Sequence, residues 1–165
     1  MKKIEVEIPE GKEAKWVGNV LTLVDEQPKS IMDRVKSYED ACKELGIEPV
    51  SDHSYSTHFL ALVKLETIVE ALNEGWIANE HMDEKWWYPW FYRFNKSNES
   101  EYKDYVFVCS NFSSNPDSGV AFVDVAYVTS HTYSHCGSRL ALKSKELAVY
   151  CGKQFIQLWC DYLLG

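Results

Sequence analysis

The residues best suited to chemistry lie near the start of the last helix that the sequence predicts. Arg139 belongs to a short stretch with alternating apolar residues, and Lys143 and Lys145 follow it closely. Ser144 is a good N-cap for the helix. The free N–H groups of a first helical turn, together with nearby cations, can bind a phosphate or another anion. The alternative is that Arg139 forms a salt bridge with one of the many acidic residues.

An aromatic run, WWYPWFYRF at 86–94, is the second candidate. Trp87 and Trp90 are typical of residues that stack on a base, a nucleotide or a sugar. The alternative is that alternate members of the run face the core and the others shield the rim of a sheet. Together with Arg139 and Lys143, these two tryptophans define the small-ligand or nucleotide site that the sequence predicts.

Metal and nucleophile chemistry have weaker signals. His131, His135 and Cys136 have a spacing that can bind zinc if a fourth ligand such as Cys109 joins them, but no recognised zinc pattern matches. A Cys–His nucleophile pair would need Cys136 or Cys109 together with His131, or with the distant His53, His58 or His81, and nothing in the local sequence supports one. We therefore expect no catalytic residues, no bound metal and no cofactor.

The C-terminal segment predicts a strand and then one long amphipathic helix. Residues 138–142 alternate as in a half-buried strand, and Ser144 caps a helix that runs to the end of the chain. Apolar residues recur at spacings of four, four, three and four along one face of this helix: Leu147, Cys151, Phe155, Leu158 and Tyr162. Gly152 costs about 1 kcal/mol relative to alanine within a helix. It indicates a close approach by a neighbouring strand or helix, or alternatively a ligand contact.

The remaining pattern predicts an α+β fold. Ser37 and Asp40 form a capping-box-like pair that begins a helix at 37–45, and Ser56 or Thr57 caps a second helix at 56–74. Pro89 lacks the N–H that an inner strand needs, so the aromatic run should be an edge strand or a loop leading into one. Further strands are expected at 105–109 and 120–128. We expect an antiparallel sheet between about residues 88 and 142, covered on one face by the 56–74 helix and the C-terminal helix.

The first 25 residues predict a separate β meander. Strands at 3–8, 13–17 and 20–24 are expected, with Gly18-Asn19 as the hairpin turn. A linker should connect this meander, residues 1–25, to an α+β core domain at 35–165. Because so small a sheet has little core of its own, it must pack on something or pair with another copy, which predicts a homo-oligomer.

Composition narrows the function classes. A net charge of −8 argues against general nucleic-acid binding, because neutralising phosphates requires an excess of Lys and Arg. No signal peptide or membrane span is recognisable, so we expect no membrane partner. The five cysteines include no CxxC pair, and Cys42, Cys151 and Cys160 lie in apolar helical settings that favour buried free thiols. These features predict a cytoplasmic protein.

Several phrases resemble one family over nearly the whole chain: IPEGKEAKWVGNVLTLVDE, SYEDACKELG, ALNEGW, WYPWF and GSRLALKSKELAVYCGKQF. The chain is similar to small uncharacterised proteins of Bacteroidales genomes and of their phages and prophages. The last phrase is the most specific. The resemblance implies an intracellular protein of phage or mobile-element origin, and it carries over no activity and no site residue.

Three functional hypotheses follow. The leading one is a non-enzymatic phage or prophage accessory protein that acts by protein–protein binding in the host cytosol. The second is a small-ligand or nucleotide-binding protein that sequesters an anionic molecule with Arg139, Lys143, Trp87 and Trp90. The third is a structural component of a virion.

Overall fold

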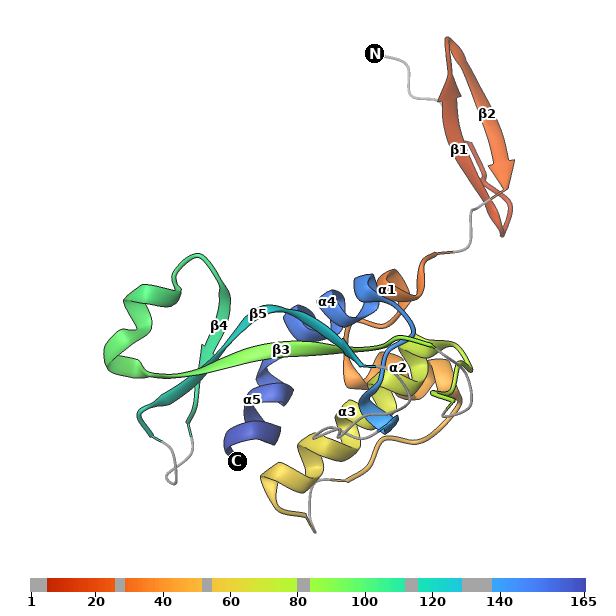
Figure 1. The fold of residues 1–165 in the computed structure, drawn as a ribbon. Coiled ribbons are helices and arrows are strands. Elements are labelled where there is room, and N and C mark those ends of the chain that lie inside the picture. Colours follow the sequence, from red (N-terminus) through yellow and green to blue (C-terminus); the bar gives the residue numbers. More distant parts are fainter. Residues whose placement is uncertain (1–5, 26–28, 52–54, 80–83, 112–115, 129–137) are drawn as a thin grey trace. The chain divides into compact units, whose positions relative to one another are not determined.

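The structure is a computed structural model, and it describes residues 6–25, 29–51, 55–79, 84–111, 116–128 and 138–165. The chain forms two compact units, Met1–Ser30 and Ile31–Gly165. Helices accompany antiparallel sheets, with a small hairpin in the first unit, so the predicted α+β class is confirmed (Figure 1). None of the helices in the described ranges has the length and apolar character needed to cross a bilayer.

The N-terminal unit is a two-stranded hairpin. Strand β1 (Lys12–Val17) pairs with β2 (Val20–Asp25), and Gly18 turns between them with a φ of 62°, a conformation that glycine adopts without strain. The predicted third strand at 3–8 is wrong for residues 6–8, which lie outside any strand, and residues 3–5 fall outside the described residues. The turn closed by the Lys12 N–H and the Pro9 carbonyl, 3.1 Å apart, does not bring residues 6–8 alongside β1.

The larger unit contains a three-stranded antiparallel sheet. Its strands are β3 (Trp86–Asn95), β4 (Val106–Cys109) and β5 (Ser118–Val128), in the order β3-β5-β4. The aromatic run is therefore an edge strand, as Pro89 predicted. A bulge interrupts the β3–β5 register between Trp90 and Phe91.

Helices pack on this sheet and on one another (Figure 1). They are α1 (Ile31–Arg34), α2 (Tyr38–Leu45), α3 (Thr57–Asn73), α4 (Lys145–Gln154) and α5 (Ile156–Leu164). Helices α4 and α5 lie against the strands, and α3 packs on α5 and α2. The main core joins side chains from these helices and from β3, among them Leu65, Ile68, Leu72, Trp86, Tyr88, Leu147, Cys151 and Trp159.

Helix α1 corrects the prediction that residues 25–34 form only a linker. Ile31 and Val35 are buried in the core, and the Val35 N–H donates to the Ile31 carbonyl at 2.9 Å. In the sequence, the polar residues around Pro28 made the apolar pair Ile31 and Val35 difficult to recognise as part of the core. The segment therefore belongs to the larger unit from Ile31 onwards.

The prediction of one long C-terminal helix is wrong, because the helix breaks at Phe155. This residue ends α4 with φ −109° and ψ 28°, and α5 begins immediately after it. The break lets α4 stay on β3 while α5 packs against α3. Phe155 and Trp159 are both buried as a result.

The predicted strand at 138–142 is also wrong. Residues Ser138–Leu140 form a 3-10 turn, η3, and only Leu142 pairs with β3, through two hydrogen bonds with Trp87 of 3.0 and 2.9 Å. The next bonding position on this edge of β3 is Pro89, which has no N–H to offer. The pairing therefore stops after one bridge.

Gly152 has the close neighbour that the sequence predicted. A Cβ atom at this position would lie 2.5 Å from the Phe122 ring and 2.8 Å from Pro89 Cβ. The sheet thus approaches α4 closely at Gly152, which has no side chain. The prediction that a neighbouring strand lies close to this residue is confirmed.

Candidate functional site

Arg139 faces an acidic residue of α3, and Lys143 faces the acidic residue at the C-cap of the same helix. The Arg139 guanidinium lies 3.4 Å from the Glu66 carboxylate, and its side chain is 79% exposed. The Lys143 ammonium donates to the backbone carbonyl of Asn73 at 3.1 Å and to the Glu74 carboxylate at 3.0 Å. The hydrogen bond from Lys143 lowers the pKa of Glu74 below its ordinary value. Arg139 and Lys143 therefore each have a carboxylate partner within the fold, whereas Lys145, the third cation of the predicted anion site, forms no salt bridge in the described part of the chain.

The cavity beside Arg139 has an acidic lining. Its volume is about 320 Å³, and it lies between the second half of α3 and the η3 turn. Glu66 and Glu70 line it together with Arg139, and the indole of Trp76 adds an apolar wall. Two carboxylates beside one guanidinium oppose the entry of a phosphate.

Trp87 and Trp90 do not join these cations in one cavity. Trp87 is half-buried, and its ring centroid lies 5.2 Å from that of Tyr127. Trp90 is 54% exposed. Neither tryptophan lines the cavity beside Arg139. The structure therefore places Arg139 and Lys143 against α3 and leaves the aromatic pair on the sheet.

Of the proposed metal and nucleophile residues, His131, His135 and Cys136 lie outside the described residues. Cys109 is half-buried with its Sγ 3.7 Å from a Glu99 oxygen. Within the described ranges, no three His, Cys, Asp or Glu side chains gather closely enough to hold a metal ion.

The three helical cysteines are buried free thiols, as predicted. Burial raises the pKa of Cys151 to about 12 and that of Cys160 to about 11. Cys42 is also fully enclosed. Because the thiolate is the reactive form, Cys151 and Cys160 are inert packing groups at neutral pH.

Asn73 positions the segment that carries Arg139 and Lys143, and it was not identified from the sequence. Its amide nitrogen donates to the Ala141 carbonyl at 2.8 Å, and its amide oxygen accepts from the Lys143 N–H at 3.0 Å. The side chain is buried at the C-terminal end of α3. The only sign of this role in the sequence was an amide side chain next to the apolar stripe of the predicted helix.

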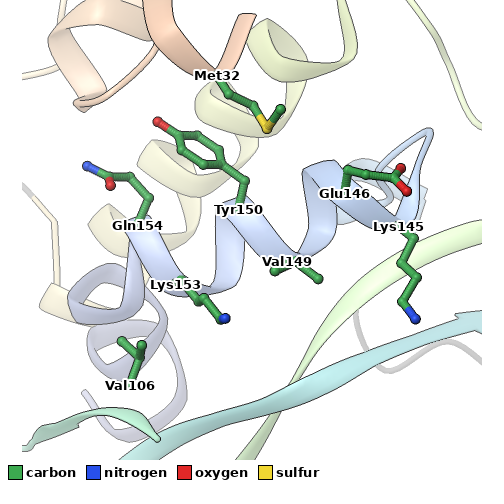
Figure 2. Close-up of a pocket in the computed structure, with 8 residues that line it drawn as sticks. All are labelled: Met32, Val106, Lys145, Glu146, Val149, Tyr150, Lys153 and Gln154. Atoms are coloured by element: carbon green, nitrogen blue, oxygen red, sulfur yellow. The ribbon is translucent and has the colours of Figure 1, made fainter.

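A second concave surface, which we call the α4 groove, was not predicted (Figure 2). Its volume is about 560 Å³. It is lined by side chains from α1, β4 and α4: Met32, Val106, Lys145, Glu146, Val149, Tyr150, Lys153 and Gln154. Three segments that are distant in the sequence form this groove. From the sequence, only its α4 part could have been recognised, because polar residues alternate there with Val149 and Tyr150.

Most polar atoms of the α4 groove are already engaged. The Tyr150 hydroxyl donates to the Val35 carbonyl at 2.7 Å, and the Gln154 amide donates to the Lys36 carbonyl at 3.0 Å. Glu146 lies in the first turn of α4, and its own backbone N–H lowers the pKa of its carboxyl group.

The exposed Arg139–Glu66 pair allows a first prediction. Replacing Arg139 with alanine should change the free energy of unfolding by less than about 1 kcal/mol, because exposed salt bridges contribute little. Urea denaturation of R139A, E66A and the double variant measures the coupling energy. A coupling energy well above about 1 kcal/mol would show that the pair organises the fold here.

Comparison with known proteins identifies no relative of this chain. No family model matches the chain, and no curated protein or solved structure matches it significantly.

Proposed function

We propose that the chain acts by protein–protein binding and that its N-terminal hairpin is the binding element. The antiparallel register pairs Ala14 with Leu23 and Trp16 with Leu21. Directly opposed residues share one face of a sheet, so these four side chains form an apolar face. We call it the hairpin face.

The hairpin face is open to solvent. Trp16 is 71% exposed, and Leu21 and Leu23 are exposed as well. No residue in the described part of this unit is buried. A lone two-stranded hairpin is marginally stable in water, and contiguous exposed apolar side chains mark interaction surfaces. This uncovered face is the observation that carries the proposal.

The other face of the hairpin is more polar at its centre. Lys15 pairs across the strands with Thr22, and its ammonium lies 2.5 Å from the Glu13 carboxylate. Val17 and Val20 lie on this side next to the turn, and both are exposed. The largest apolar side chains, Trp16, Leu21 and Leu23, lie on the hairpin face, which is therefore the face that needs a partner.

The partner that fits this surface is a second copy of the chain. One side of a hairpin of two six-residue strands is roughly 20 Å by 10 Å, and the four side chains of the hairpin face lie within it. This is about 200 Å², well below the roughly 800 Å² that each side of a stable interface buries. The face alone is therefore too small. Identical hairpins can bring their apolar faces together and also join their edge strands, which increases the buried area.

The resemblance to small proteins of Bacteroidales and their phages supports the biological setting of this proposal. In that setting the chain is a non-enzymatic accessory protein of phage or prophage origin, and it works in the host cytosol. Self-association would bring several copies of the larger unit together for a shared target.

Light scattering after size-exclusion chromatography tests the proposal. The full chain should show a mass that is a multiple of 19.1 kDa and that falls towards 19.1 kDa on dilution. The W16S/L21S variant should be monomeric at the same concentrations, since it removes the apolar face. Raising the salt concentration should favour the oligomer, because the net charge of −8 on each copy is then screened.

The control is K15S, which alters the more polar face of the same hairpin. It should keep the mass of the unaltered chain. A monomer at every concentration, or an oligomer that W16S/L21S leaves intact, would contradict the proposal.

A further inference from the structure

The α4 groove has an apolar surface of the size that small ligands use. Met32 and Val149 are half-buried, and Val106 of β4 is exposed at its rim. Its volume of about 560 Å³ lies within the range of roughly 300–1,000 Å³ that is usual for small-molecule sites. Helix α4 lies between α1 on one side and β4 on the other (Figure 2).

Two lysines flank this apolar surface. Lys145, Val149 and Lys153 recur every four residues, and their side chains point to the same side of α4 (Figure 2). Eight residues of helix separate the two lysines by about 12 Å along the axis. Neither forms a salt bridge in the described part of the chain, although the Lys153 ammonium lies 5.4 Å from the centroid of the Phe122 ring. Both are exposed.

The other polar groups of the groove restrict the charge of the ligand that it can bind. Tyr150 and Gln154 already bind backbone carbonyls. Glu146 is held as a carboxylate at the helix start. The groove thus carries two cations and one anion, in a chain whose net charge is −8. The two lysines lie on the side of α4 away from Tyr150, where they complement a single anionic group (Figure 2). Glu146, together with Asp33 and Asp40 near Tyr150, opposes a polyanion such as a triphosphate.

We propose that the α4 groove binds an amphipathic organic anion. The apolar part of the ligand lies on Val106 and Val149, on the side of α4 to which both lysines point, and its carboxylate or other single anionic group is held by Lys145 or Lys153. This site shares Lys145 with the predicted anion site but not Arg139 or Lys143, which are paired with Glu66 of α3 and with Glu74 at its C-cap. It lies within the larger unit and does not depend on the hairpin.

Titration of the full chain with decanoate tests this site. Calorimetry should give saturable binding, and the largest changes in a ¹H–¹⁵N spectrum should fall on the amides of Val106, Val149 and their neighbours. 1-Decanol, which has the same tail without the charge, should bind at least tenfold more weakly. K145E/K153E should also weaken decanoate binding at least tenfold, which corresponds to about 1.4 kcal/mol.

The matched control is K43E, a charge reversal at an exposed lysine of α2 that does not line the groove. It should bind decanoate as the unaltered chain does. K145Q/K153Q removes the charges without reversing them, and it should give a smaller loss in the same direction. No saturable binding, equal affinity for 1-decanol, unchanged affinity in both double variants, or spectral changes centred away from α4 would each overturn the proposal.

Discussion

Replacing Asn73 with alanine is expected to lower the free energy of unfolding by about 2–4 kcal/mol. The buried amide binds the Ala141 carbonyl and the Lys143 N–H, at 2.8 and 3.0 Å. Alanine would leave both backbone groups without their partner, and each buried unsatisfied group costs about 1–3 kcal/mol. Urea denaturation followed by tryptophan fluorescence measures the loss.

Two further variants make this result specific. N98A removes an exposed amide and should change stability by less than about 0.5 kcal/mol. N73D keeps an acceptor for the Lys143 N–H but loses the donor to Ala141, so it should also destabilise the fold. A loss below about 1 kcal/mol in N73A would mean that water replaces the amide.

Gly152→Ala is expected to destabilise the fold by about 1–3 kcal/mol, in the range of an overpacked core. In an exposed helix the same change would stabilise by about 1 kcal/mol. Here the new methyl group would lie 2.5 Å from the Phe122 ring and 2.8 Å from Pro89 Cβ, so α4 or the sheet must move. The sign of the change therefore reports the close packing of α4 on the sheet, and thermal or urea denaturation measures it.

A double variant checks the cause. F122L/G152A gives the new methyl group space, so it should be more stable than the sum of the two single changes predicts. Additive losses, or a stabilising G152A, would contradict the close approach of Phe122 to α4.

Local signals predicted the helix starts well. Ser37 and Asp40 form the expected capping box, with the Asp40 N–H donating to the Ser37 hydroxyl at 3.1 Å and the Ser37 N–H donating to the Asp40 carboxylate at 3.0 Å. Ser56 and Ser144 cap α3 and α4. These interactions span only three residues, so the sequence contains everything that determines them.

The errors arose where distant residues decide the local structure. Residues 138–142 have the alternation of a strand, but Pro89 of β3 and Asn73 of α3 limit them to one bridge after a 3-10 turn. The apolar spacing across Phe155 suits one continuous helix, yet α3 and the sheet require two directions of packing. Neither constraint lies within the segment that it alters.

The same distinction applies to the candidate sites. Arg139 could be identified as a cation near a helix start, but its partner Glu66 lies 73 residues away in the chain. The α4 groove combines Met32, Val106 and residues of α4. Only the folded chain shows that the first site is paired internally and that the second presents lysines to solvent.

The position of Pro89 has a consequence for solubility. The ten-residue strand β3 places the whole aromatic run, 86–94, at the edge of a sheet, an arrangement that promotes pairing between molecules and the growth of fibrils. Trp87 already bonds to Leu142, and Pro89 offers no N–H at the next position on this edge. An incoming strand therefore meets an interrupted ladder at this end. The chain can gather its aromatic side chains in one strand without presenting a continuous template for aggregation.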